Sequence, residues 1–277
     1  MKRPDLGRIR KIRSDPPVFF ARELVSTNDS LKKGLSEEIF PPESSLLCAR
    51  QIGGRGRPGN RWHSERGDLT MSRWILPTPA WPLMTPSISL AVAVACLMTF
   101  DDFGLSDTLW KFPNDLYGKT RPSEGASRMG KLGGILVEVA RKRDGALTGW
   151  IAGIGINLRP FDESFPENLP LDIPPLSLSD LSPSKILGFG PVALTTHLSR
   201  RIGDILRNKD PEEVRSILEG RLLWKDQWVA YRLQGELKIG QIVALGEEGN
   251  LILKDHEGKK EYLGPSVRKM RPLEVCD

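Results

Sequence analysis

The pattern of the sequence changes near Glu236, and this change constrains the fold more than any other feature. Before it, strand-like and helix-like segments alternate along most of the chain. After it, the short alternating strands LKIGQIVALG, LILKD and KEYLG are separated by the turn signals EEGN and DHEGK. Short strands at this spacing are typical of a small β-barrel. The sequence therefore predicts a large α+β domain followed by a small all-β domain.

The larger domain is predicted to contain a sheet and at least one buried helix. Strand-like composition recurs over the segments 18–25, 44–51, 69–76, 108–112, 131–140 and 150–158. The apolar run 88–100 is too short to span a bilayer and predicts a buried helix. A capped helix is expected over 26–35, irregular chain over the proline-rich segment 159–191, and helices again over 192–223.

We place the domain boundaries at 1–17 for a basic N-terminal arm, 18–230 for the larger domain and 231–277 for the barrel. The net charge of +5 comes from the arm, where six basic residues face one acid within the first 13 positions. Because the rest of the chain is neutral overall, this charge predicts a solvated tail and not a basic protein face.

The cysteines, the histidines and the start of the chain argue against several classes of protein. The three cysteines and three histidines form no CxxC pair and show no metal-ligand spacing, so neither a structural zinc site nor a disulfide framework is indicated. The basic start lacks the apolar stretch of a secretory signal. We therefore expect a cytoplasmic protein without a membrane anchor.

A loop rich in glycine and arginine separates two of the predicted strands. GRGRPGNRW, residues 54–62, carries Arg55, Arg57 and Arg61 without one acid. Glycines let backbone N–H groups approach phosphate oxygens, and guanidinium groups bind such oxygens in bidentate fashion. The loop lacks the GKS or GKT ending of a P-loop, which argues against an ordinary ATPase. It predicts an anion-binding loop, with a flexible basic surface turn as the alternative.

Three further motifs place polar side chains beside predicted strands. They are WKFPNDLYGK from position 110, GKLGGILVEV from position 130 and GIGIN from position 153. The side chains that they present are Lys111, Asn114, Asp115, Lys131 and Asn157. Taken one at a time, the motifs also fit an ordinary turn, a solvated lysine before a strand, and a bulge at a sheet edge.

In their order along the chain, STN, Q-x-x-GRGR-x-G-x-x-W, K-x-PND, GKLGGILVE and GIGIN resemble the catalytic domain of biotin protein ligases, and the resemblance covers residues 20–277. It implies a mixed-sheet catalytic domain of the biotin/lipoate ligase type with a small SH3-like β-barrel at the C-terminus. It also implies an enzyme that uses ATP, biotin and Mg²⁺ to form biotinyl-5'-AMP. The biotin would then pass to a lysine of a biotin carboxyl carrier protein, a subunit of acetyl-CoA carboxylase or a related carboxylase.

The same resemblance implies roles for individual residues. Those expected to bind biotin are Ser26, Thr27, Asn28, Gln51, Gly54, Arg55, Arg57, Lys131 and Gly134. Those expected to bind ATP are Arg57, Trp62, Lys111, Asn114, Asn157 and Arg268. The catalytic residues would be Lys131, Arg57 and Asp115, and no metal ligand is assigned.

The chain also departs from the family pattern. Phe112 stands where tryptophan is usual, Pro58 and Asn60 replace basic residues in the loop, and the alignment of residues 116–129 stays open. Only 25 residues precede Ser26, whereas bifunctional relatives carry a DNA-binding domain there, so no DNA is expected among the partners. The oligomeric state stays open, a homodimer included.

Two other functions compete with this interpretation. A lipoate or octanoate protein ligase has the same fold, but the GRGR loop and the GKLGGILVE strand favour the biotin branch. A non-enzymatic nucleic-acid-binding protein could use the arginine loop on phosphates. The neutral body of the chain and the lack of an aromatic-rich strand argue against it, since Tyr262 is the single Phe, Trp or Tyr residue from Glu236 onward.

Overall fold

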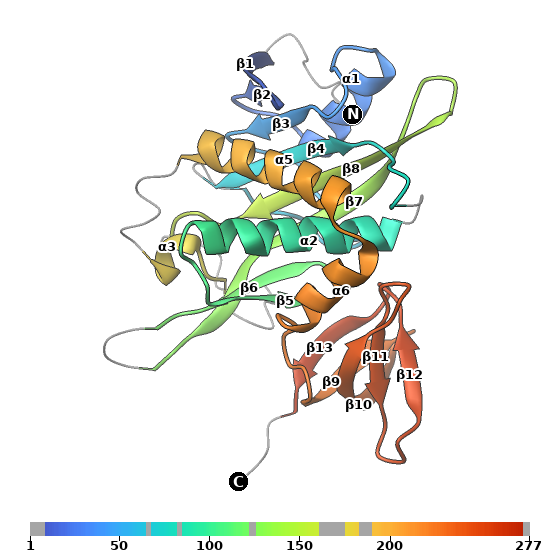
Figure 1. The fold of residues 1–277 in the computed structure, drawn as a ribbon. Helices are drawn as coiled ribbons and strands as arrows, with labels where there is room; N and C mark the ends of the chain where they lie inside the picture. The colour runs from blue at the N-terminus through green and yellow to red at the C-terminus, as the bar shows by residue number, and fades with distance from the viewer. Residues whose placement is uncertain are drawn as a thin grey trace.

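A computed structural model describes residues 9–64, 68–81, 85–121, 126–160, 175–182 and 190–273. A mixed eight-stranded sheet with helices on both faces makes up the larger part, and a five-stranded antiparallel sheet follows it (Figure 1). This confirms the predicted α+β class with an appended all-β unit, called the C-terminal sheet below. Within the described residues, no helix is both long and apolar enough to cross a membrane.

The large sheet has the strand order β1-β2-β3-β4-β8-β7-β6-β5. Its strands are β1 (Arg10–Ser14), β2 (Pro17–Ala21), β3 (Ser45–Cys48), β4 (Leu69–Ile75), β5 (Thr108–Lys111), β6 (Asp115–Lys119), β7 (Met129–Arg141) and β8 (Leu147–Ile156). β2 and β3 are parallel and the other neighbours antiparallel. A parallel pair needs a crossover, and helix α1 (Thr27–Ser36) provides it.

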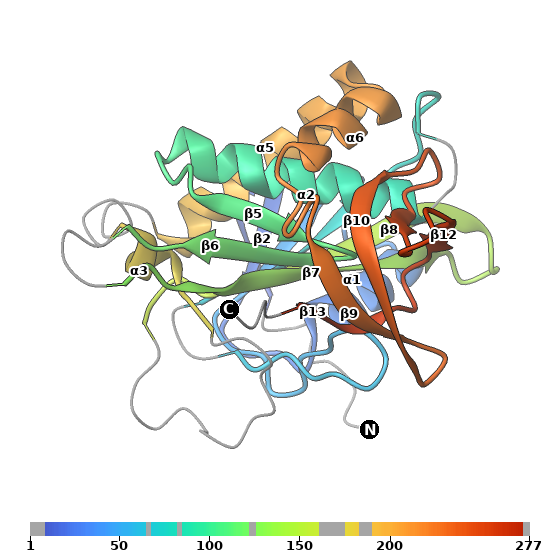
Figure 2. The same cartoon turned by 90° about the horizontal axis from the view of Figure 1, so that it is seen from below.

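Helices cover both faces of this sheet (Figure 2). α2 (Thr85–Asp102), α5 (Pro191–Asn208) and α6 (Pro211–Glu219) lie on one face and α1 on the other. The middle of α2 is buried on all sides, because the helix packs against the sheet, α5 and α6 at once. Adjacent residues of β3 point to opposite faces of the sheet. Leu46 belongs to the apolar cluster under α1, and Leu47 belongs to the cluster under α2.

The C-terminal sheet begins earlier than the sequence suggested. Its strands are β9 (Trp228–Leu233), β10 (Glu236–Leu245), β11 (Leu251–Lys254), β12 (Lys260–Leu263) and β13 (Arg268–Pro272), in the order β12-β11-β10-β9-β13. The boundary expected between residues 230 and 231 falls inside β9. It moves to before Trp228, because Val229 and Tyr231 already point into the core of this sheet.

Part of the expected N-terminal arm belongs to the large sheet. Arg10–Ser14 pairs with Pro17–Ala21 as an antiparallel edge, so the predicted solvated tail is corrected for these residues. An edge strand tolerates exposed basic side chains, and the guanidinium carbon of Arg10 lies 5.5 Å from the centre of the Phe20 ring. Residues 1–8 lie outside the described part of the chain.

Between residues 18 and 223, two elements of the described chain were not predicted from the sequence. β6 follows β5 after only three residues, where the sequence suggested a turn and uncertain alignment. The short helix α3 (Leu178–Leu181) interrupts the proline-rich segment, and Ser177 and Asp180 form its capping box. Elsewhere in that segment, residues 161–174 and 183–189 are outside the description.

Candidate functional site

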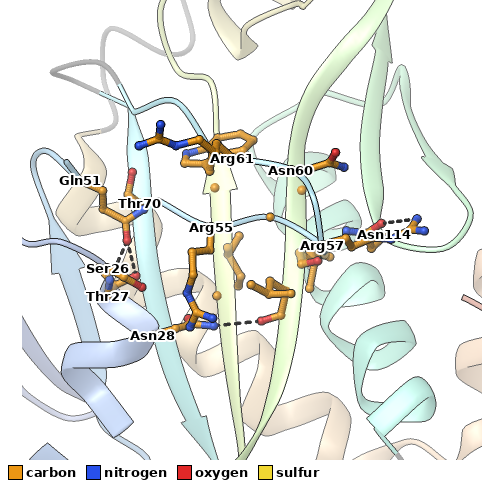
Figure 3. A pocket seen from close by; sticks show the side chains of 18 of the residues that line it. Ser26, Thr27, Asn28, Gln51, Arg55, Arg57, Asn60, Arg61, Thr70 and Asn114 are labelled. Atoms are coloured by element: carbon orange, nitrogen blue, oxygen red, sulfur yellow. Dashed lines mark hydrogen bonds between the residues drawn. The ribbon is translucent and has the colours of Figure 1, made fainter. Parts of the chain in front are cut away.

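A pocket lies on the α1 face of the large sheet, beneath the glycine- and arginine-rich loop of residues 53–62 (Figure 3). The N-terminus of α1 forms one wall, β4, β8 and β7 form the floor, and Asn114 and Asp115 form the opposite wall. The predicted residues that line it are Ser26, Thr27, Asn28, Gln51, Arg55, Arg57, Trp62, Asn114, Asp115, Lys131 and Gly134. The structure therefore gathers the residues of four separate motifs around one cavity.

Glycines make up much of the pocket floor. Gly134 of β7 lies opposite Gly155 of β8, so both present the same face toward the pocket. A Cβ atom on Gly155 would lie 2.4 Å from the indole of Trp62, and one on Gly153 would lie 2.4 Å from the Asn28 side chain. The glycines of GIGIN therefore let Trp62 and Asn28 pack directly against the strand.

A buried polar recess forms where α1 begins. Ser26 caps the helix, and the backbone N–H and hydroxyl of Thr27 donate to Gln51 Oε1 at 2.6 and 3.0 Å. Ser72 Oγ lies 2.7 Å from Thr27 Oγ1 and 2.5 Å from Asn28 Oδ1. Ser72 was not predicted. The strand LTMSRWI could have suggested Ser72, because side chains alternate along a strand and Ser72 therefore shares a face with Thr70.

Lys131 of β7 and Asp115 of β6, two of the predicted catalytic residues, form an ion pair. Lys131 Nζ donates to Asp115 Oδ1 at 2.6 Å, and both side chains are partly exposed to the pocket. Gly134 has no side chain to fill the space beside this ion pair. A Cβ atom at this position would make only ordinary contacts with Asp115 and Lys131. The pair thus combines a cation with a carboxylate at the same point of the cavity.

Arg57 connects the loop to the C-terminal sheet. Its guanidinium donates to the carbonyl oxygens of Pro265 at 2.7 Å and Val267 at 2.8 Å, and more weakly to Asn114 Oδ1 at 3.5 Å. In return, Arg268 donates to the carbonyl of Pro58 at 3.4 Å. Burial lowers the pKa of Arg57, and the positive charge of Arg268 lowers it further. Two guanidinium groups are therefore held close together at the rim.

Arg55 leaves the loop in another direction, toward α1 (Figure 3). It pairs with Asp29 Oδ1 at 2.5 Å and Glu138 Oε2 at 3.1 Å. Glu138, which the sequence analysis missed, also accepts from Asn28 at 2.6 Å and Lys32 at 2.8 Å. Burial works to raise the pKa of Glu138, but hydrogen bonds from Lys32 and Asn28 hold it below its ordinary value. Arg55 thus pairs with two acids, whereas the hydrogen bonds of Arg57 go to carbonyl and amide oxygens.

Four predicted residues do not line the pocket. Gly54 packs its backbone against Trp62, where a Cβ would lie 2.5 Å from the Trp62 carbonyl oxygen. The Asn157 side chain donates to backbone carbonyls, and Arg268 lies at the rim. Lys111 Nζ sits 4.9 Å from the centre of the Trp224 ring. Among the described residues, no group of three His, Cys, Asp or Glu side chains could hold a metal ion.

Residues 20–157 match the model of the biotin/lipoate A/B protein ligase family. The chain is 30% identical over 236 residues to the bifunctional ligase/repressor BirA of Bacillus subtilis, covering 82% of this chain and 66% of that protein. It is 27% identical over 255 residues to BirA of Bacillus spizizenii, covering 89% of this chain and 72% of that protein. The fold is similar to that of a biotin protein ligase from Aquifex aeolicus, solved with biotin and ATP, with a TM-score of 0.68 and 21% identity over 92% of this chain and 99% of that chain.

The half-buried Lys111 allows a test of the electrostatics at this end of the sheet. Burial, and then the charges of Lys131, Arg271 and Arg57, lower the pKa of Lys111 from 10.5 to about 8, although Asp115 works to raise it. The charged lysine therefore destabilises the folded state below pH 8, and this destabilisation is relieved as the pH rises from 8 to 10.5.

We expect Lys111→Met to be more stable than the wild type at pH 7, with an advantage that shrinks as the pH rises through 8 toward 10.5. Urea unfolding followed by circular dichroism at several pH values measures the difference in free energy of unfolding. An advantage that stayed constant or grew with pH would show that Lys111 is not held in a desolvated position.

Proposed function

The chain belongs to the biotin/lipoate A/B protein ligase family, and we propose that it is a biotin protein ligase that activates biotin with ATP and transfers it to a protein lysine. One observation carries this proposal: a single pocket joins a buried polar recess at the start of α1 to the cations Lys131 and Arg57. A substrate with a polar ring at one end and a carboxylate at the other fits this arrangement.

Biotin would place its ureido ring in the recess at the start of α1. A ureido group carries both hydrogen-bond donors and an acceptor, and Thr27, Asn28 and Gln51, which line the pocket, offer partners for both kinds. The indole of Trp62 and the glycine floor would cover the apolar part of the molecule. The valeryl chain would then direct the carboxylate toward Lys131.

The first step brings two anions together. A biotin carboxylate oxygen attacks the α-phosphorus of ATP, the bond from this phosphorus to the bridging oxygen breaks, and pyrophosphate leaves. Lys131 and Arg57 would stabilise the charge that develops on the α-phosphate, and their contacts with Asp115, Pro265 and Val267 hold them in place. No serine or cysteine nucleophile is needed, because the product is a mixed anhydride held non-covalently.

The nucleotide would lie between the large sheet and the C-terminal sheet. The positive charge of Arg268 helps to lower the pKa of Arg57, so a polyphosphate between the two side chains would relieve this repulsion. Lys111 and Asn114 lie on the same side, and Trp62 offers a ring for stacking. Trp62 Nε1 is buried and has no partner within the described structure, which leaves a donor for a bound ligand.

Among the described residues, no three His, Cys, Asp or Glu side chains lie together in a way that could hold a metal ion. We therefore assign the metal no protein ligands and propose that it enters with the phosphates of ATP. The protein's own contribution to charge stabilisation is the set of lysine and arginine side chains.

The second step needs a neutral amine from the acceptor protein, proposed to be a biotin carboxyl carrier protein. The amine attacks the acyl carbon of the anhydride, a carbon–nitrogen bond forms, and AMP leaves. Asp115 lines the pocket beside Lys131 and could orient the amine or accept its proton.

Isothermal titration with biotin, lipoate and octanoate, each with and without Mg-ATP, tests the proposed substrate. We expect biotin alone of the three to bind and to release pyrophosphate when ATP is present. An equal or stronger response to lipoate or octanoate would replace this proposal with a ligase for those acids. Salt-dependent binding of oligonucleotides without adenylate formation would instead favour a nucleic-acid-binding protein.

Removing Lys131 should nearly abolish adenylate formation and leave the fold intact. Loss of one preorganised charge contact in such a site costs about 3 kcal/mol of transition-state stabilisation, or roughly a hundredfold in rate. Biotin-dependent exchange of labelled pyrophosphate into ATP measures the effect in Lys131→Ala. A variant that kept a tenth of wild-type exchange would exclude Lys131 from the reaction. Unchanged circular dichroism spectra serve as the control for folding.

Removing Arg57 should release the intermediate early. Arg57→Gly loses both hydrogen bonds to the C-terminal sheet and adds backbone freedom in the middle of the loop. We expect biotin labelling of an unrelated protein such as albumin, measured per adenylate formed, to rise about tenfold or more, the ratio given by roughly 1.4 kcal/mol of lost loop closure.

The control for this variant is Arg61→Gly, which adds the same backbone freedom to the loop but keeps the hydrogen bonds from Arg57 to Pro265 and Val267. It should leak less than Arg57→Gly. Background labelling by Arg57→Gly, with labelling of the true acceptor intact, would show that Arg57 does not retain the intermediate.

A further inference from the structure

An irregularity in the pairing of β6 with β7 lies directly beside the pocket. Leu116 lies opposite Gly133, but the next residue, Tyr117, lies opposite Lys131, so Leu132 is an extra residue in β7. Such a β-bulge changes which face of the sheet the following side chains point to.

The bulge is the reason why Lys131 faces the pocket. Side chains alternate along a regular strand, so Lys131 would otherwise share the face of Gly133, which is turned toward α2. With the bulge, Lys131 lies on the same face as Gly134 and its Nζ reaches Asp115 at 2.6 Å. Leu132 is fully buried in the core cluster under α2.

One residue holds the two backbone carbonyls of this bulge. The backbone N–H of Asn157 donates to the Leu132 carbonyl at 2.8 Å, and its side-chain amide donates to the Lys131 carbonyl at 3.2 Å. The same amide group donates to the carbonyl of Leu176 at 3.0 Å, and the Leu176 N–H in turn donates to the Lys131 carbonyl at 2.9 Å. Asn157 is only 6% exposed.

We propose that Asn157 is a positioning residue that holds the β7 bulge and thereby keeps Lys131 in the pocket. The proposal rests on the proposed function, because Lys131 is there the cation that stabilises the transition state. The amide nitrogen of Asn157 already donates to two protein carbonyls, and the expectation that Asn157 binds ATP stays a prediction.

The chemistry of the position requires an amide. Two hydrogens on one planar nitrogen are needed to reach the carbonyls of Lys131 and Leu176 together. An aspartate has almost the same shape but would place a carboxylate against these two carbonyl oxygens. The carboxylate repels both oxygens, removes the side-chain donor to the Leu176 carbonyl and leaves the Lys131 carbonyl with only the Leu176 N–H as a donor. Asn157→Asp therefore disturbs the bulge with little change in side-chain volume.

The test compares wild type, Asn157→Asp and Asn157→Ser. We expect Asn157→Asp to lower biotin-dependent pyrophosphate exchange by roughly ten- to a hundredfold, the effect of displacing a reacting group by about 1 Å. Biotin binding without ATP should change by less than about twofold, because the recess at the start of α1 is untouched. Asn157→Ser keeps one hydrogen-bond donor, so its exchange rate should lie between those of wild type and Asn157→Asp. This variant preserves the comparison if the aspartate variant fails to fold.

A double-mutant cycle shows whether Asn157 acts through Lys131. In a Lys131→Ala background, adding Asn157→Asp should lower exchange by less than about twofold, since the group it positions is already absent. An equal fold-loss in both backgrounds would overturn the proposal. Ser177→Ala, which weakens the cap of α3 next to Leu176 without touching the Lys131 carbonyl, is the matched control and should keep the exchange rate.

A second measurement does not depend on activity. Acetylation of Lys131 by an N-hydroxysuccinimide ester, quantified by mass spectrometry, reports whether its amine stays in the pair with Asp115. We expect the extent of Lys131 acetylation to change severalfold in Asn157→Asp and to stay at the wild-type level in Ser177→Ala. Unchanged acetylation in Asn157→Asp overturns the proposal. Absence of biotin-dependent exchange in the wild type instead overturns the proposed function and leaves this measurement valid.

Discussion

The long antiparallel pairing of β7 with β8 is the constraint on which the site depends. On one face these strands build the core under α2, with Ile135, Ile154 and Ile156 buried there. On the other face they present glycines, so the same pairing is both the centre of the hydrophobic core and the floor of the pocket. A rigid, buried ladder of this kind holds the pocket floor more precisely than a loop could.

The electrostatics of the pocket separate its arginines into two kinds. Arg55 is neutralised by Asp29 and Glu138 and fastens the loop to α1. Within the described chain, the hydrogen bonds of Arg57 go to carbonyl and amide oxygens, and burial and the charge of Arg268 lower its pKa, although the charge of Asp115 works to raise it. A cation that neutral hydrogen-bond acceptors hold in place is preorganised for an anionic ligand. The protein does not have to reorganise when the negative charge of the ligand arrives.

The C-terminal sheet belongs to the site as well as to the fold. The backbone of Trp110 exchanges hydrogen bonds with the segment that leads into β9, and Glu219 accepts from the N–H of Leu245. Against this fixed base, the carbonyls of Pro265 and Val267 bind Arg57. The loop over the pocket is thus anchored by two separate parts of the chain.

The sequence by itself determined the α+β class, the two-part organisation, most strands and the motifs that supply the pocket, because periodicity, turn residues and Gly-Arg spacing are local properties. It could not determine that Arg55 pairs with Glu138, since 83 residues separate them and only the α1 crossover brings them together. Nor could it reveal the bulge that turns Lys131 into the pocket, or the role of Asn157 in holding it. These depend on strand register, which is decided by how the sheet packs against α2 and not by the residues of GKLGG alone.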